Sequence, residues 1–467
     1  MSNWRSMKQE NLLLAMVAVA SCFLTASGSM AQAPGSQEAP GGPVLDPSIR
    51  ATYVHLANGV PGVLYEPKSP GERARISLFV MHASGDYLTF SACQEMSRRG
   101  YRVLCANNTN SKSGAADDGV LYRTMLEVKA GITYLRNYAG IDRVVLFGHS
   151  GGATVMTAYQ DIAENGVKVC QGPNILEKCP GTLAGMPAAD GVVLADANLG
   201  QAEMVLLSVD PAVTNEDSGM RINPALDLYN PANGFNPNGS TYSQEFIRKW
   251  QIAAGKRMSA MVERARERVA AIDAGKGQFL DDEPFTVPGS FVAGNKLFPQ
   301  DVRLLSRSRK PWPLIHADGS ITTEIIRSIR VPEGGQSSTP YMRGALKTTV
   351  RNFLSSWGIR MNGEFSYDAD TIRGVDWNST MASIPGNVEG ITVPLLTLGM
   401  TGHWEGLAAE TIYDHTRSSD KSIAFVEGAL HSYAPCTRCG KTPDQFGDTV
   451  RLTYDYVDSW LARKGRL

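Results

Sequence analysis

The chain has 467 residues, which is room for about three average domains or for one large domain with an insertion. Its 45 Lys and Arg residues against 46 Asp and Glu residues give a net charge of -1. This balance excludes the strongly basic surface by which proteins bind nucleic acids through phosphate contacts. A hydrophobic content of 43%, with 46 Gly and 25 Pro residues, is that of an ordinary globular protein.

The N-terminal residues have the pattern of a secretory signal peptide. Arg5 and Lys8 precede an apolar run over residues 12–24, and small residues follow that run. These small residues predict cleavage after Ala31, which would remove residues 1–31.

Residues 32–46 form a Pro- and Gly-rich spacer ahead of the first core segment. We expect a secreted or periplasmic protein. Residues 19–22 (VASC) also resemble a bacterial lipobox, in which Cys22 would become a lipidated N-terminus, and this is the alternative. No later stretch approaches the roughly 18 uninterrupted apolar residues of a membrane span, so no span is expected after signal removal.

Six cysteines remain after the expected cleavage, an even number that suits an oxidising compartment. Pairing of neighbours along the chain predicts three disulfides, Cys93–Cys105, Cys170–Cys179 and Cys436–Cys439. Small buried thiols are the alternative. The last pair also has the CxxC spacing of redox and zinc sites, but there is no second CxxC and no strand-then-helix pattern around it.

Short apolar runs alternate with helical periods over residues 47–210, which predicts a mostly parallel sheet with helices on both faces. The predicted strands are 76–81, 101–106, 144–147 and 192–196. One predicted helix spans 91–99. A second, which ends at Gly140, carries its apolar residues on one face, namely Leu121, Met125, Val128, Ile132 and Leu135.

The alternation stops at residue 211 and returns in a second core part, over 379–467, with predicted strands at 393–398 and 423–427. We interpret residues 211–378 as a large helical cap, inserted before the penultimate strand. Within the cap, a capping box at residues 241–244 (TYSQ) predicts a long helix that ends near Gly275, and a second helix is predicted over 343–357.

Residues 148–152 (GHSGG) match the pattern G-x-S-x-G, directly after the predicted strand 144–147 and before a predicted helix. A serine hydroxyl is a weak nucleophile, and a strand-to-helix turn flanked by glycines exposes it to a base and a substrate. With this context the sequence resembles the α/β-hydrolase superfamily over residues 52–210 and 390–467. The resemblance implies an α/β-hydrolase fold with Ser150 as the nucleophile.

The same resemblance implies a histidine at the end of a triad whose order along the chain is nucleophile, acid, histidine. His431 fits that place, because it follows the predicted strand 423–427 through a short loop. His55 lies too early, His316 lies within the predicted cap, and His415 lies in a predicted helix.

The acid is the least defined member of the predicted triad. The family usually has an Asp or Glu shortly after the penultimate strand, and Glu405 is the nearest carboxylate there. Glu410 and Asp196 stay open as alternatives, and Asp210 and Asp414 are lesser candidates. Whichever residue acts, a buried carboxylate would fix the tautomer of the imidazole and stabilise the imidazolium.

Two backbone N–H groups would have to stabilise the developing oxyanion. The resemblance implies Gly151 as one donor and the loop at residues 82–86 (HASGD) as the source of the other. Because Ala83 replaces the first glycine of the family's loop, the second donor is either Ala83 or Ser84, and we predict Ser84.

Together these features predict a serine esterase that works through an acyl-enzyme on Ser150, without a metal or an organic cofactor. The large cap favours a small or medium ester over a polymer as the substrate. An amidase or peptidase with the same triad is one alternative, and a non-catalytic binding protein that keeps the fold is another.

Overall fold

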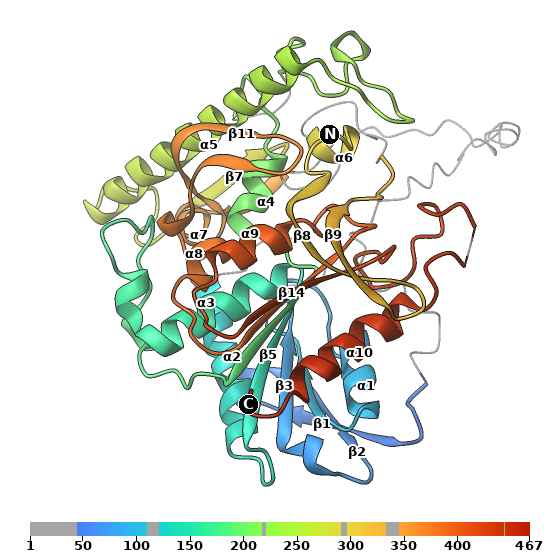
Figure 1. The fold of residues 1–467 in the computed structure, drawn as a ribbon. Coiled ribbons are helices and arrows are strands. Elements are labelled where there is room, and N and C mark those ends of the chain that lie inside the picture. Colours follow the sequence, from blue (N-terminus) through green and yellow to red (C-terminus); the bar gives the residue numbers. More distant parts are fainter. Residues whose placement is uncertain (1–43, 110–120, 217–220, 291–296, 333–344, 443) are drawn as a thin grey trace, which may run out of the picture.

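The computed structural model describes residues 44–109, 121–216, 221–290, 297–332, 345–442 and 444–467 (Figure 1). The expected signal peptide, residues 1–31, and residues 32–43 of the expected spacer lie outside this part of the chain. Among the described residues, no helix has the length and apolarity that a membrane crossing requires.

A ten-stranded sheet forms the centre of the structure, with its strands in the order β1-β2-β4-β3-β5-β6-β13-β14-β8-β9. Pairing is parallel from β4 to β8, and it is antiparallel at both edges, among β1, β2 and β4 and between β8 and β9. The first eight strands in this order are β1 (Ile49–His55), β2 (Pro61–Pro67), β4 (Arg102–Ala106), β3 (Ile76–Met81), β5 (Arg143–His149), β6 (Gly191–Ala195), β13 (Leu395–Met400) and β14 (Lys421–Val426).

The six strands predicted from apolar runs are all present, as β3, β4, β5, β6, β13 and β14. They are buried on both faces, which is why each reads as a continuous apolar run. The hairpin of β1 and β2 is not predicted. Most residues of β1 are exposed, so this strand lacks the apolar run that marks the others.

Helices cover both faces of the sheet (Figure 1). Helices α1 (Ser91–Arg98) and α10 (Thr449–Leu461) contribute to the buried cluster on one face, and α2 (Leu121–Arg136) and α3 (Gly151–Asn165) to the cluster on the other. The predicted apolar face of α2 is fully buried. Its Gly131 permits close packing, because a Cβ there would overlap the ring of Phe79 in β3.

The stretch between β6 and β14 is less helical than the sequence predicts. Its elements are α4 (Gln201–Ser208), α5 (Gln244–Asp273), β7 (Pro284–Pro288), α6 (Leu297–Gln300), β8 (Arg307–Ile315), β9 (Ile321–Arg327), β10 (Ala345–Thr349), α7 (Val350–Asn352), β11 (Arg360–Tyr367), β12 (Ile372–Asp376), α8 (Ile384–Val388), β13, and α9 (Ala408–His415). Strands β8 and β9 continue the central sheet beside β14, so part of the predicted cap, residues 211–378, belongs to the sheet. The limits of the cap stay a prediction.

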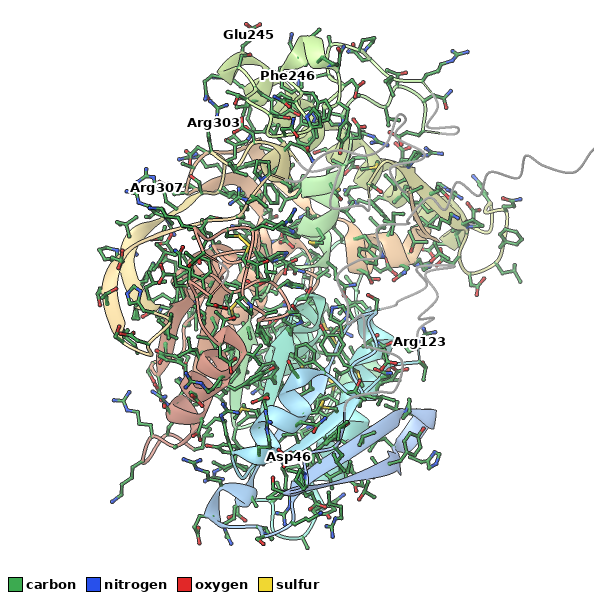
Figure 2. All side chains as sticks on the ribbon, turned by 90° about the vertical axis from the view of Figure 1, so that its right-hand side faces the viewer. Asp46, Arg123, Glu245, Phe246, Arg303 and Arg307 are labelled. Atoms are coloured by element: carbon green, nitrogen blue, oxygen red, sulfur yellow. A yellow bond between two sulfur atoms is a disulfide. The ribbon has the colours of Figure 1, made fainter. Side chains whose placement is uncertain are left out.

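The long helix of the cap is confirmed. The helix begins at Gln244, and its N-cap is Ser243, not Thr241 as the predicted capping box implies; the Ser243 side chain accepts a hydrogen bond from the N–H of Phe246. The helix ends at Asp273, close to the predicted Gly275. Glu245, in its first turn, and Asp46, just before β1, lie at opposite ends of the molecule (Figure 2).

The second predicted helix, over 343–357, is wrong in its first half. Residues 345–349 form strand β10, which pairs antiparallel with β7. Helical structure begins after this strand, with one turn of α7 and then a π-helix, Phe353–Trp357. The β-branched residues Thr348 and Thr349 favour a strand. The spacing of residues within this segment cannot show that β7, which is distant in sequence, pairs with it.

The three predicted disulfides, Cys93–Cys105, Cys170–Cys179 and Cys436–Cys439, are present. The first connects α1 to β4, and the second closes a loop after α3. The third closes a short turn in the segment that follows β14. Each therefore fixes a connection beside the central sheet.

Candidate active site

Ser150 stands in a sharp turn between β5, which ends at His149, and α3, which begins at Gly151. Its backbone has φ 53° and ψ -133°, a region that residues with a side chain rarely adopt. Strain of this kind persists only where the surrounding structure enforces it, and it is concentrated at functional sites. The strand, turn and helix predicted around the GHSGG motif are thus confirmed.

The two outer glycines of the motif permit close contacts between backbones. A Cβ on Gly148 would lie 2.6 Å from the Cα of Ala153, and one on Gly152 would lie 2.6 Å from the carbonyl oxygen of Met81. Either contact is far inside van der Waals distance, so only glycine fits at both positions. The turn is thereby held against the end of β3.

His431 lies in the loop after β14, the eighth strand of the sheet, and it faces two carboxylates. Its Nδ1 lies 2.7 Å from Oδ2 of Asp196 and 3.5 Å from Oε2 of Glu405. The Asp196 side chain is fully buried, and that of Glu405 is 2% exposed. The first distance is that of a charge-assisted hydrogen bond, whereas the second is too long for one.

Two features together identify the fold. The strands have the order β1-β2-β4-β3-β5-β6-β13-β14, and β2 is antiparallel to its neighbours. A strained serine follows β5, and a histidine follows β14. The chain has the α/β-hydrolase fold. A strand-to-helix turn, or elbow, at this place in the fold presents its side chain at the carboxyl edge of the sheet. Strands β8 and β9 are an addition at the sheet's far edge.

Asp196 directly follows β6 in this fold, and its backbone and hydrogen bonds set the direction of its side chain. Its φ of 46° is in the left-handed region, and its Oδ1 accepts a hydrogen bond from the N–H of Met400 in β13. The other oxygen, Oδ2, is therefore directed at His431. Burial alone would raise the pKa of Asp196, but His403 and His431 outweigh it and hold the pKa below its usual range.

A second histidine, which the sequence reasoning did not select, contacts the same carboxylate. The Nδ1 of His403 lies 2.8 Å from Oδ2 of Asp196, and the rings of His403 and His431 are stacked with centroids 4.3 Å apart. His403 lies two residues before Glu405, in the segment after β13. Its position beside the predicted acid was the only signal for it in the sequence.

The other candidate carboxylates have different partners. Glu410 accepts hydrogen bonds from the Trp312 indole and from the backbone N–H groups of Arg309 and Lys310. Asp414 pairs with the side chains of those same two basic residues. Both therefore hold β8 to α9.

Asp210 is also engaged away from His431, since its Oδ1 accepts a hydrogen bond from the N–H of Ala212. Two of the histidines set aside by position have partners of their own: His316 pairs with Glu427 and His415 with Glu389.

His149, the variable residue of the motif, holds the backbone of the His431 loop. Its Nε2 lies 2.8 Å from the carbonyl oxygen of His431, and its Nδ1 lies 2.5 Å from the hydroxyl of Tyr87. A carbonyl oxygen only accepts, so Nε2 carries the proton and Nδ1 accepts from Tyr87. Burial, together with the nearby His431, lowers the pKa of His149 well below its usual value, so the ring stays neutral.

The loop after β3 lies against the start of α3. Ser84 and Gly85 donate their backbone N–H groups to Nδ1 of His82, at 3.1 and 2.6 Å. The Ala83 side chain and the His82 ring border Gly151, at 3.5 and 3.4 Å from where a Cβ on that glycine would stand. The Ser84 N–H is thus directed at His82, whereas Ala83 lies beside the first residue of the helix.

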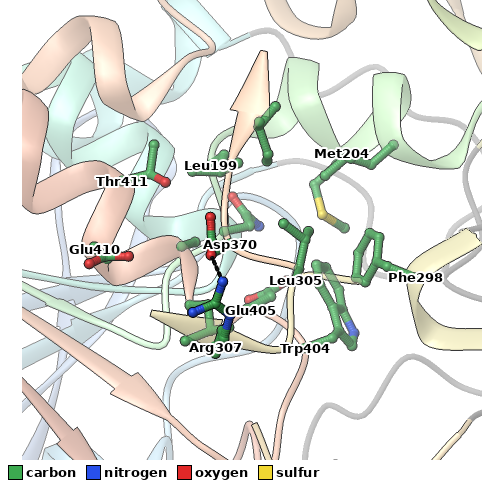
Figure 3. Close-up of a pocket in the computed structure, with 15 residues that line it drawn as sticks. Leu199, Met204, Phe298, Leu305, Arg307, Asp370, Trp404, Glu405, Glu410 and Thr411 are labelled. Carbon is green, nitrogen blue, oxygen red and sulfur yellow. Dashed lines mark ion pairs between the residues drawn. The ribbon is translucent and has the colours of Figure 1, made fainter. Parts of the chain in front are cut away.

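A pocket lies next to Glu405 (Figure 3). Its apolar wall comes from three parts of the chain and consists of Leu199, Met204, Leu207, Phe298, Leu305, Ile372, Trp404, Leu407 and Ala408. Its polar side includes Arg307 and Asp370, whose side chains pair at 2.7 Å. The pocket is therefore formed jointly by the segments after β6 and β13 and by the inserted stretch.

Several solved structures resemble this chain at low identity. Est1E from Butyrivibrio proteoclasticus is 10% identical, with 88% of this chain and 97% of that chain covered and a TM-score of 0.36. The siderophore hydrolase EstB from Aspergillus fumigatus is 14% identical, with coverages of 90% and 99% and a TM-score of 0.41. Carboxyl esterase 2 from Tuber melanosporum is 10% identical, with coverages of 91% and 88% and a TM-score of 0.38.

No protein-family model matches the sequence, and no curated protein sequence matches it. At such identities and TM-scores, the assignment of the fold depends on this chain's own strand order and elbow.

Proposed function

We propose that the protein is a serine hydrolase that cleaves carboxylic esters through an acyl-enzyme on Ser150. The observation that carries the proposal is the strained serine at the elbow, on the same edge of the sheet as a histidine bonded to a buried carboxylate. A neutral serine needs a base to become a nucleophile, and a base needs a fixed tautomer. The bond to Asp196 supports the fixed tautomer, and the position of His431 after β14, at the same edge as Ser150, supports its role as the base.

In the proposed reaction, the Nε2 atom of His431 takes the proton of Ser150 as the serine oxygen attacks the ester carbonyl carbon. Collapse of the tetrahedral intermediate expels the alcohol, which receives that proton from the imidazolium. Water then attacks the acyl-enzyme with His431 again as the base. The acid is released and Ser150 regains its proton.

We propose Asp196, rather than the expected Glu405, as the triad acid. The shorter distance to His431, 2.7 against 3.5 Å, supports this choice. The bond of Oδ1 to Met400 also fixes the direction of the carboxylate. Asp196 accepts from Nδ1, which leaves Nε2 without a proton and ready to act as the base.

The oxyanion donors are proposed to be the N–H groups of Gly151 and of Ala83. Gly151 follows the nucleophile at the start of α3, where backbone N–H groups have no partner within the helix. For the second donor, the bond of the Ser84 N–H to His82 favours Ala83 over the predicted Ser84. The contact of Ala83 with Gly151 supports the same choice.

The pocket beside Glu405 supports a substrate with an apolar group of small to medium size. Most of its lining residues are apolar, as in other small-molecule sites. We propose that the protein acts after export, as a secreted or periplasmic enzyme, in agreement with its three disulfides.

A fluorophosphonate probe tests the proposal, because it labels only an activated serine. The mature protein is expected to be labelled, and Ser150→Ala is expected to abolish labelling. Absence of labelling in the unmodified protein, or labelling that survives in the variant, would refute the proposed function. A panel of p-nitrophenyl esters and matched anilides then separates an esterase from an amidase.

A further inference from the structure

Four side chains with metal-binding atoms converge at the buried end of the proposed triad. Asp196, His403, Glu405 and His431 each offer one such atom, and the four atoms lie within 4.8 Å of one another. Two are imidazole nitrogens and two are carboxylate oxygens. An acid, base and nucleophile by themselves require only one histidine and one carboxylate at this place, so half of the cluster is not used by the reaction.

The spacing of these atoms is close to that of a tetrahedral zinc site. Ligand atoms about 2.0–2.2 Å from a tetrahedral zinc ion are about 3.3–3.6 Å from one another. The separations here are 2.7 Å from His431 to Asp196, 2.8 Å from His403 to Asp196 and 3.5 Å from His431 to Glu405. All separations are at most 4.8 Å, so side-chain shifts of about 1 Å would suffice to admit the ion.

The charges of the cluster also suit a divalent cation. Both ionic partners of Asp196 among the described residues are histidines. With neutral imidazoles, the two carboxylates carry two negative charges, which one divalent ion would balance. An imidazole nitrogen 2.8 Å from a carboxylate oxygen either donates its N–H to that oxygen or shares a metal ion with it.

We propose that Asp196, His403, Glu405 and His431 form an inhibitory site for a divalent transition metal, and that Zn²⁺ is the ion it binds. Two imidazole and two carboxylate ligands match zinc, whereas Mg²⁺ and Ca²⁺ prefer oxygen ligands alone. Binding by itself is independent of the proposed function. Only the inhibition rests on it.

Inhibition follows from the tautomer of His431. A zinc ion bound at Nδ1 takes the place of the proton that this nitrogen shares with Asp196. The neutral ring then carries its proton on Nε2, and no proton is lost from the imidazole. Because Nε2 is the atom that must accept the proton of Ser150, the enzyme with zinc bound has no base.

The ion has a route to the cluster. The His403 and His431 side chains are 12% and 11% exposed, so both rings reach solvent at the site. Glu405 also borders the pocket of Figure 3, which gives the fourth ligand contact with a cavity. Zinc could therefore bind the folded enzyme.

The binding test uses the mature Ser150→Ala protein, which has no hydrolase activity but retains all four ligands. After removal of metals with a chelator, calorimetric titration with ZnCl₂ is expected to show one site with a dissociation constant in the micromolar range or tighter. His403→Ala and Glu405→Gln, each added to Ser150→Ala, are expected to weaken binding at least about tenfold. MgCl₂ is expected to give no binding.

His415→Gln is the matched control, because His415 also pairs with a carboxylate, Glu389, at 2.8 Å but lies outside the cluster. Binding as tight in the His403→Ala protein as in the His415→Gln protein overturns the proposal, as does the absence of a zinc site in Ser150→Ala. Circular dichroism shows whether each variant folds. If one of the two ligand variants, His403→Ala or Glu405→Gln, does not fold, the other is used for the comparison.

The inhibition test measures ester hydrolysis by the unmodified enzyme. Zinc is expected to inhibit it at the concentration that fills the calorimetric site, and excess chelator is expected to restore the rate. Full activity with the site filled overturns the inhibitory role. If the protein binds zinc but hydrolyses no substrate, the metal site stands and the proposed function fails; an active enzyme without a zinc site gives the reverse result.

Discussion

Nδ1 of His431 lies 2.7 Å from Oδ2 of Asp196, a residue 235 positions earlier in the chain. The contact forms because β6 and β13 are neighbours in the sheet and β14 lies beside β13. Loops after adjacent parallel strands emerge at the same edge, so the ends of β6 and β14 meet there. Glu405 follows β13, and its Oε2 lies 3.5 Å from Nδ1 of the same histidine.

Replacement of the two carboxylates distinguishes their roles. Asp196→Asn is expected to lower kcat about 10³- to 10⁴-fold, because the amide no longer fixes the productive tautomer of His431. Glu405→Gln is expected to lower kcat less than about tenfold, since Glu405 is beyond hydrogen-bond distance. Steady-state hydrolysis of a p-nitrophenyl ester measures both. A larger loss in Glu405→Gln would make Glu405 the acid.

The bond between Tyr87 and His149 is expected to position His431, the proposed base. Tyr87→Phe keeps the aromatic ring but removes the hydroxyl that bonds Nδ1 of His149, which in turn holds the carbonyl of His431. A loss of about 1–1.4 kcal/mol corresponds to a fall in kcat of about five- to tenfold, with KM nearly unchanged.

Tyr433→Phe is the control for that prediction. Tyr433 is buried, and its ring lies 5.2 Å from that of His149, yet its hydroxyl makes no hydrogen bond within the described residues. We expect kcat to stay within about twofold of the unmodified enzyme. Equal losses in the Tyr87 and Tyr433 variants would show that packing, and not the hydrogen bond, positions the loop.

Adjacent glycines in the elbow are expected to differ in their tolerance of a methyl group. In Gly152→Ala the new Cβ would stand 2.6 Å from the Met81 carbonyl oxygen, which predicts a loss of more than about 2 kcal/mol in the free energy of unfolding. In Gly151→Ala the nearest atom is 3.4 Å away, so a change of less than about 1 kcal/mol is expected. Urea unfolding of both variants measures the difference, and equal stabilities would contradict the close contact.

Glu203 in α4 is expected to make stability depend on pH. Burial raises the pKa of Glu203 from its ordinary value of 4.5 to about 8. Between these values the unfolded chain has lost the proton that the folded protein keeps, so the free energy of unfolding falls as pH rises, by at most about 1.4 kcal/mol per pH unit. The stabilising contribution is complete below about pH 4.5 and lost above about pH 8.

Glu203→Gln removes this dependence and keeps the shape of the side chain. The variant is therefore expected to gain stability relative to the unmodified protein between about pH 5 and about pH 9 in urea unfolding. Asp161, whose pKa burial raises to about 7, is present in both proteins, so its contribution cancels in the comparison. Parallel pH profiles for the two proteins would mean that Glu203 does not titrate in this range.

Local sequence was enough for the buried strands of the core and for several of its helices. Strands buried on both faces read as apolar runs, α2 shows its buried face as a helical period, and the glycines around Ser150 mark the strand-to-helix turn. Neighbouring cysteines paired as expected because chain proximity brings them together. Where pairing with a distant strand competes with a local pattern, as for β10 and β7, the local prediction is wrong.

The choice among carboxylates was decided only by the tertiary structure. Sequence placed Asp196 and Glu405 after two strands without showing that those strands are neighbours, and it gave no direction for either side chain. Strand pairing, the bond of Asp196 to Met400 and the contact with His403 supply that direction. Residue types and spacing thus determined which chemistry this chain can host, and the packing of distant loops determined which atoms meet, because a hydrogen bond depends on tenths of an ångström.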